Sequence, residues 1–158
     1  MKKLFLITLY ILLSMPVIAE DTIYLNEKWD KEASKQLYEY VLKKVNMTPE
    51  KAYEAFGYRI SDVRAVFYDL NSDGINEIIG YIDVPYSYSM DGANLFILKN
   101  NGTVYEDISG INFRAGYGIQ IFDMKTNSYR NLGIVATKMH KSLVAKYNKR
   151  YYEYYFPN

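Results

Sequence analysis

The stretch VFYDLNSDGINEIIGY, residues 66–81, contains two β-type runs separated by an oxygen-rich loop. Val66-Phe67-Tyr68 precedes the loop and Ile78-Ile79-Gly80-Tyr81 follows it, and β-branched and aromatic residues of this kind favour strands. The loop consists largely of Asp, Asn, Ser and Gly, which are the usual turn-forming residues. The stretch therefore predicts a β-hairpin and argues against a helix–loop–helix.

Further β-type runs continue to the end of the chain, separated by turn residues and without intervening helical patterns. This spacing predicts an antiparallel β-meander of about six to eight strands. Asn101-Gly102 predicts a tight hairpin with both central residues at positive φ, and Asn148-Lys149 predicts the last hairpin. The expected strands are Arg64–Asp69, Asn76–Asp83, Leu95–Lys99, Thr103–Ile108, Ile119–Phe122, Leu132–Thr137, Ser142–Tyr147 and Arg150–Tyr155.

Two helices are expected before the strands. An apolar stripe with a four-residue repeat predicts a first helix from an N-cap at Asn26 to about Val45. The second helix has Thr48 as its N-cap, Pro49 at its first position and Gly57 just past its end. Helices followed by strands predict an α+β domain with the N-terminal helices packed on the meander. The stripe consists of Trp29, Ala33, Leu37, Val41 and Val45.

The N-terminus has the pattern of a secretory signal peptide, residues 1–19. Lys2 and Lys3 precede an apolar run from Leu4 to Met15, and Val17-Ile18-Ala19 offers a small-residue cleavage site. The run is shorter than the roughly 20 apolar residues of a membrane-spanning helix. We therefore expect a periplasmic or secreted protein, without a membrane anchor after cleavage, whose residues 20–158 form a single domain.

The composition excludes several classes of function. Two of the 19 basic residues, Lys2 and Lys3, belong to the signal, so 17 Lys+Arg remain against 18 Asp+Glu. This near-neutral balance gives no support for nucleic-acid binding, which requires a basic surface. The chain has no cysteine, which excludes disulfides and a lipid-modified cysteine, and its single histidine disfavours a zinc site. A bound metal ion is then a natural way to stabilise a small exported domain.

Side-chain oxygens stand at alternate positions in the loop Asp69–Glu77, followed by a glycine and a carboxylate. Oxygen ligands in this pattern can wrap one hard cation such as Ca²⁺. An EF-hand is excluded, because its glutamate would fall on Gly80. The alternative is a polar hairpin loop without a metal, since the same residue types form ordinary turns.

The loop resembles the Asp-x-Asn-x-Asp-Gly-x-x-acid loops of exported β proteins of the FG-GAP and VCBS type. From about Val63 to Tyr155 the chain is similar to small, mostly uncharacterised periplasmic proteins with a DLNGDG-type hairpin. Two departures are that Ser72 replaces the usual Gly and that the cysteines flanking a Gly-rich loop in relatives are absent. The matching pieces are Asp69–Glu77, Asp91–Leu98, Asn127–Leu132 and Tyr147–Tyr152.

This resemblance implies a structural Ca²⁺ bound by five residues. Side-chain oxygens would come from Asp69, Asn71 and Asp73 and a backbone carbonyl from Ile75, and Glu77 would close the coordination shell. Gly74 would permit the sharp bend that brings these groups around one point.

No residues form a catalytic constellation, and we expect no enzymatic activity. The single histidine, His140, has no Gly-x-Ser-x-Gly motif to accompany it. Partner-binding candidates are Tyr86 and Tyr88, which lie in a stretch of residue types common in adaptable binding surfaces. Ser109 to Phe113 is similar to the Ser-Gly-x-x-Tyr loop of periplasmic lysozyme inhibitors, with Phe113 in place of Tyr.

The sequence thus favours an exported, non-enzymatic binding or structural domain that recognises an unidentified protein or cell-wall partner. The alternative is a periplasmic inhibitor or immunity-type protein against a lysozyme or another wall-degrading enzyme. In that case the binding residues would be Tyr88, Ser109 and Phe113.

Overall fold

The computed structural model describes residues 19–25, 27–84, 88–89, 92–110, 114–115, 118–135 and 143–155. Its helical elements are α2 (Lys31–Val45), α3 (Pro49–Phe56) and the 3₁₀ turn η1 (Ile60–Asp62). Its strands are β1 (Ala19–Ile23), β2 (Val63–Tyr68), β3 (Glu77–Ile82), β4 (Tyr88–Ser89), β5 (Gly92–Asn100), β6 (Tyr105–Asp107), β7 (Arg114–Ala115), β8 (Gly118–Thr126), β9 (Tyr129–Val135), β10 (Leu143–Tyr147) and β11 (Tyr152–Tyr155).

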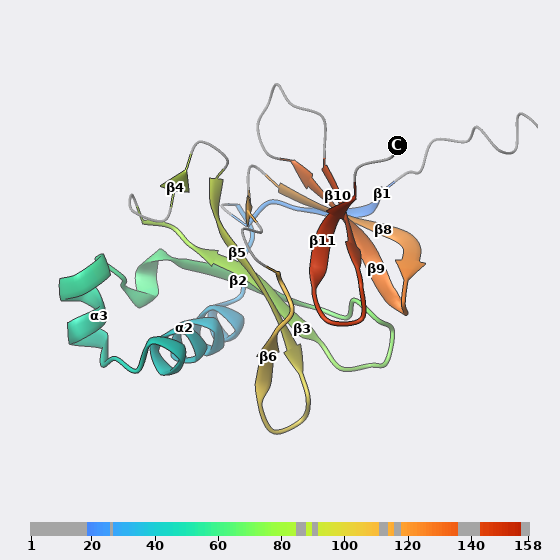
Figure 1. Ribbon diagram of the computed structural model, residues 1–158. Coiled ribbons are helices and arrows are strands. Elements are labelled where there is room, and N and C mark those ends of the chain that lie inside the picture. Colours follow the sequence, from blue (N-terminus) through green and yellow to red (C-terminus); the bar gives the residue numbers. More distant parts are fainter. Residues whose placement is uncertain are drawn as a thin grey trace, which may run out of the picture.

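The strands form two antiparallel sheets, with the helices beside one of them (Figure 1). A five-stranded sheet has the order β1-β8-β9-β10-β11, and a six-stranded sheet follows β2-β3-β5-β4, with β6 and β7 also paired to β5. The predicted α+β class and the eight predicted strands are therefore confirmed. The predicted meander is confirmed in part: β8 to β11 pair in chain order, but the strands divide between two sheets, and β1 pairs with β8 at the edge of the five-stranded sheet.

The burial of β3 explains why two sheets are needed. Ile79 and Tyr81 belong to a buried apolar cluster shared with the five-stranded sheet. Ile78 and Ile82, on the opposite face, belong to a second cluster shared with α2. Since both faces of the strand are apolar, helices on one side alone would leave the other in water.

Helix α2 confirms the apolar stripe but corrects its starting point. The helix begins after Asp30, whose side chain accepts a hydrogen bond from the backbone N–H of Ala33 at 2.8 Å. The predicted N-cap at Asn26 is therefore wrong, and Trp29 lies outside the helix and is 45% exposed. The helix starts later because the segment before it runs along the edge of β2, where the N–H of Asp30 donates to the carbonyl of Ala65.

Helix α3 matches its prediction at both ends. The Thr48 hydroxyl accepts from the N–H of Lys51, Pro49 is the first helical residue, and Gly57 ends the helix in the left-handed region with a φ of 73°. No helix within the described ranges is sufficiently long and apolar to span a membrane.

The hairpin turns differ from the predictions in position. Asn100 pairs with Tyr105, so the loop that contains Asn101 and Gly102 has four residues. Gly102 has a positive φ, whereas Asn101 does not. The last hairpin likewise has a four-residue loop, in which Lys149 has a φ of 85°. The two-residue turn occurs instead between β8 and β9, where Asn127 and Ser128 have φ values of 51° and 74°.

Strand β1 begins at the predicted cleavage site. Ala19 pairs with Phe122, and Asp21, Thr22 and Ile23 pair with β8. The predicted signal peptide is otherwise outside the described residues.

Candidate functional site

The Asp69–Glu77 loop joins β2 to β3, whose ends pair through Tyr68 and Glu77. Leu70 fixes the loop to the protein interior, since its side chain is fully buried between the two sheets. The Leu70 carbonyl also accepts a hydrogen bond from the N–H of Arg130 in β9 at 2.8 Å. The loop is therefore attached to both sheets, although it extends from only one of them.

The carboxylate of Asp69 receives backbone amides of its own loop. Its Oδ1 accepts from the N–H of Ser72 at 2.6 Å, and its Oδ2 accepts from the N–H of Gly74 at 3.0 Å. Desolvation raises the pKa of Asp69, but the amides of Gly74 and Ser72 outweigh it and hold the pKa below its ordinary value. This carboxylate is thus kept ionised near neutral pH.

Asn71 and Asp73 repeat the same arrangement two and four residues later. Asn71 Oδ1 accepts from the N–H of Asp73 at 2.9 Å, and Asp73 Oδ1 accepts from the N–H of Ile75 at 2.8 Å. The Asn71 amide also donates to Asp73 Oδ2 at 2.7 Å. Ser72 and Gly74 bend the chain with φ values of 64° and 83°, so Ser72 takes a left-handed conformation that a glycine adopts more easily.

Glu77 lies beneath the loop and is only 1% exposed. Its Oε2 accepts from the N–H of Leu70 at 2.9 Å. Burial, together with the negative charges of Asp73 and Asp69, raises the pKa of Glu77 to about 7. A buried carboxylate beside two further acids is destabilised as an anion, and a nearby cation would reverse that penalty.

The structure brings the five predicted ligands into one loop but does not assemble them into a coordination shell. In the part of the chain that the structure describes, no three or more Asp, Glu, His or Cys side chains lie close enough together to hold a metal. The oxygens of Asp69, Asn71 and Asp73 are directed to loop amides. A carboxylate oxygen that accepts one amide retains a second lone pair, so these residues still fit a hard cation chemically.

Two residues on the β8–β9 hairpin complete the site and were not predicted. The Lys125 ammonium donates to the Asn71 carbonyl at 3.0 Å and to the Ser72 hydroxyl at 2.7 Å. The Tyr129 hydroxyl accepts from the Asn71 amide at 3.3 Å. Both lie more than 50 positions from the loop in sequence. The only sequence feature that could have indicated them is the Asn127-Ser128 turn, which joins the two strands that carry Lys125 and Tyr129.

Of the four predicted partner-binding residues, the structure describes the side-chain surroundings of Ser109 only. Ser109 is 3% exposed, and its hydroxyl and N–H both donate to Asp107 Oδ1, so the hydroxyl does not face a partner. Gly110 has a φ of 79° and lies against the Tyr152 carbonyl, where a Cβ would clash. The Ser-Gly pair therefore has a packing role here. Tyr88 lies in β4, and Tyr86 and Phe113 are outside the described residues.

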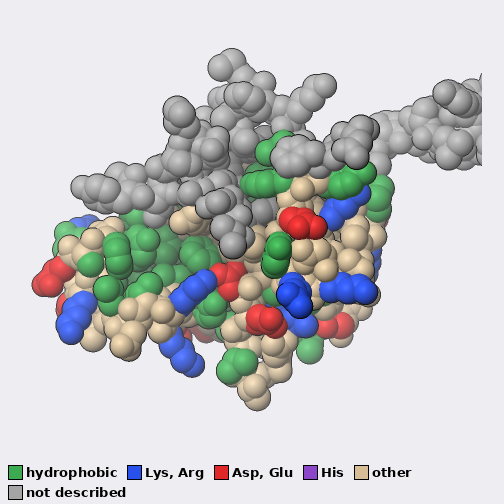
Figure 2. Space-filling view, in the orientation of Figure 1, with side chains coloured by type: hydrophobic (Ala, Val, Ile, Leu, Met, Phe, Trp, Pro, Cys, Tyr) green, Lys and Arg blue, Asp and Glu red, His purple; other side chains and the backbone are tan. Residues whose placement is uncertain are grey.

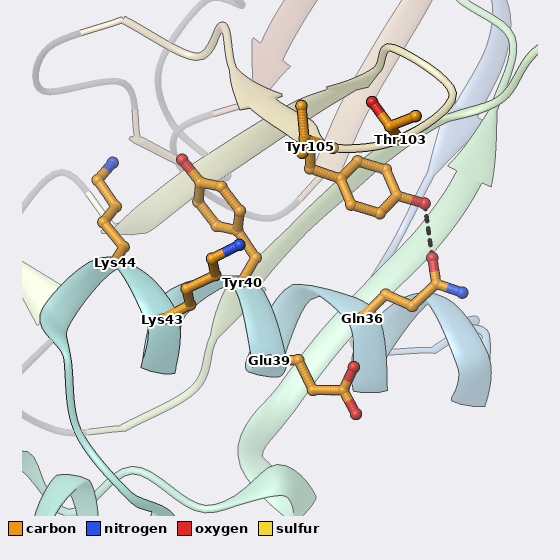
Figure 3. A pocket seen from close by; sticks show the side chains of 8 residues that line it. Gln36, Glu39, Tyr40, Lys43, Lys44, Thr103 and Tyr105 are labelled. Carbon is orange, nitrogen blue, oxygen red and sulfur yellow. Dashed lines mark hydrogen bonds between the residues drawn. The ribbon is translucent and has the colours of Figure 1, made fainter.

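A groove of about 500 Å³ runs between α2 and the β5–β6 hairpin (Figure 3). One wall is the face of α2 that carries Gln36, Glu39 and Tyr40, and the other includes Val104 and Tyr105. The Tyr105 hydroxyl donates to Gln36 Oε1 at 2.6 Å across the groove, as Figure 3 shows. This volume is typical of small-molecule and cofactor sites.

The charges around these features are balanced. On the face shown in Figure 2, acidic and basic side chains are interspersed and no extended surface of one sign appears. A surface with interspersed charges does not favour the binding of a polyanion such as a nucleic acid.

No protein-family model matches the sequence, and comparisons with curated proteins and with solved structures found no significant similarity.

Proposed function

We propose that this chain is an exported, non-enzymatic binding or structural domain whose Asp69–Glu77 loop binds Ca²⁺. The observation that carries the calcium proposal is the buried carboxylate of Glu77, which lies below a loop already rich in oxygen ligands. Asp69, Asn71, Asp73 and Glu77 would hold the ion through side-chain oxygens and Ile75 through its carbonyl. Such a set is chemically suited to Ca²⁺ because all of its donors are hard oxygens.

The ion would act structurally. It would neutralise the charges of Glu77 and its acidic neighbours and fix a loop that contacts both sheets. Lys125 supplies one positive charge to this loop through the Asn71 carbonyl and the Ser72 hydroxyl. Lys125 does not contact the Glu77 carboxylate, which has no cationic hydrogen-bond partner among the described residues. A bound cation would therefore still stabilise ionised Glu77.

The position of β1 is compatible with the proposed cleavage after Ala19. Cleavage after Ala19 would leave Asp21, Thr22 and Ile23 paired with β8. The five-stranded sheet would therefore keep its edge strand after processing. A protein or a cell-wall component is the proposed partner of the exported domain.

Thermal unfolding in Ca²⁺, in Mg²⁺ and in a chelator tests the calcium proposal. Ca²⁺ at a hundredfold excess over its Kd should stabilise the protein by about 2.7 kcal/mol, and sites in extracellular modules typically have Kd values of about 10⁻⁴–10⁻³ M. Mg²⁺ should stabilise it less, because Mg²⁺ requires a stricter octahedral shell. An Asp73→Asn variant should lose most of the response.

The matched control is Asp62→Asn, which changes an acidic residue in η1 outside the loop and should respond to Ca²⁺ like the unmodified protein. An unchanged melting temperature at about 10–100 mM Ca²⁺, a hundredfold excess over such Kd values, would remove the calcium claim and leave a hydrogen-bonded turn.

A further inference from the structure

We propose that the groove between α2 and the β5–β6 hairpin binds a short, uncharged oligosaccharide. This rests on the proposed function as a binding domain and names the class of ligand and its site. Three properties of the groove favour this ligand: two contacts that join its walls, two partly buried tyrosine rings beside an exposed valine, and charges of both signs.

The walls are held together at both ends of the groove. At one end the Tyr105 hydroxyl donates to Gln36 at 2.6 Å. At the other end the Lys44 ammonium donates to Asp107 at 2.7 Å. Gln36 and Lys44 are eight residues apart on α2, a rise of about 12 Å along the helix axis, and their partners Tyr105 and Asp107 belong to the same short strand. A groove fixed in this way loses little conformational entropy when it binds a ligand.

Two tyrosine rings supply the contact surface. Tyr40 extends from α2 and Tyr105 from β6, and both rings line the groove (Figure 3). Both side chains are partly buried, and the Lys44 ammonium lies 5.7 Å from the centre of the Tyr40 ring. The neighbouring Val104 at the hairpin tip is 55% exposed. A pyranose ring presents a face of C–H groups, which are weakly positive and pack favourably on the negative face of an aromatic ring.

The charges in the groove cancel locally. Lys44 forms an ion pair with Asp107, and Glu39, which lies 4.0 Å from Lys35, lines the groove together with Lys43. The groove therefore carries charges of both signs and has no extended basic surface of the kind that binds a polyanion. Glu39 and Lys43 instead provide one acceptor and one set of donors at the groove. Sugar hydroxyls both donate and accept, so they match this mixed set.

The experiment uses amide chemical shifts of the labelled protein during titration with chitotetraose, cellotetraose and maltotetraose. We expect at least one of them to shift the amides of Gln36, Tyr40 and Tyr105. A Tyr105→Ala variant should weaken binding about tenfold, the usual effect of one stacking contact. Gln36→Ala alters a partly exposed residue and should also weaken binding, which keeps the proposal testable if the tyrosine variant unfolds.

The matched control is Tyr53→Ala, since Tyr53 is an exposed tyrosine on α3 whose ring stacks on Arg59. Its binding should be unchanged. The proposal is overturned if none of the three sugars binds, if the shifts fall outside the groove, or if the Gln36 variant binds normally. Selective binding of a peptide or an anionic glycan in place of these sugars would overturn it as well.

The titration is repeated with Ca²⁺ and with chelator. Sugar binding by a protein whose melting temperature ignores Ca²⁺ would support the groove and refute the calcium loop. A calcium-dependent melting temperature without sugar binding would give the opposite result.

Discussion

Replacing Glu77 by Gln should stabilise the calcium-free protein at alkaline pH. Glutamine has the same shape, and its carbonyl can still accept the N–H of Leu70. The folded protein raises the pKa of Glu77 from its ordinary 4.5 to about 7, and each pKa unit corresponds to about 1.36 kcal/mol. Ionised Glu77 therefore lowers the free energy of unfolding by about 3 kcal/mol above pH 7.

The sign of the effect follows from proton binding. Between pH 4.5 and 7 the folded chain retains a proton on Glu77 that the unfolded chain has released. The free energy of unfolding therefore falls as the pH rises through this window, and the stabilising contribution of the protonated form is fully present only below it. Glutamine does not titrate, so the variant lacks this part of the pH dependence.

Urea unfolding in chelator at pH 5, 6, 7 and 8 measures the difference between the two proteins. The stabilisation by Glu77→Gln should grow across this range by most of the 3 kcal/mol. Glu54→Gln, which changes an exposed glutamate on α3, is the matched control and should give a constant difference. If the Glu77→Gln difference is also constant from pH 5 to 8, the inferred burial of a charged carboxylate is wrong.

Two further changes probe the packing. Gly80→Ala should lower the free energy of unfolding by roughly 1–3 kcal/mol, since its Cβ would lie 2.5 Å from the Arg64 carbonyl oxygen and from the Ala65 Cβ; equal urea midpoints for the variant and the parent would contradict this. Asp30→Ala should lower the free energy of unfolding by about 1 kcal/mol, because α2 loses its N-cap. Thermal unfolding measures this loss. A loss below a few tenths of a kcal/mol would show that the hydrogen bond from the Asp30 N–H to β2 is enough to fix the start of the helix.

The sequence predicted those elements that depend on local chemistry. Thr48, Pro49 and Gly57 defined α3, because capping depends on residues within one turn of the helix end. The eight expected strands were also found, because each has a local run of β-forming residues. The N-cap of α2 was misplaced, since Asn26 and Asp30 are both suitable residues and a contact with β2 decides between them.

Local sequence patterns did not predict which distant segments pair with one another. The separation into two sheets depends on which face of β3 meets which partner, and alternation within one strand does not specify that. In the candidate site, too, the residues close in sequence were predicted and the distant ones were not. Asp69, Asn71 and Asp73 could be read from the loop, whereas the contacts of Lys125 and Tyr129 arise only after β8 and β9 pack beside it.

The place of β1 in the five-stranded sheet has a consequence for the order of folding. Its partner β8 begins at Gly118, about a hundred residues later in the chain. A nascent polypeptide cannot complete this pairing until most of it has been synthesised, and such non-local contacts slow folding. The five-stranded sheet is therefore completed only after β8 has been made, whereas α2 and the β2–β3 hairpin can form earlier in synthesis.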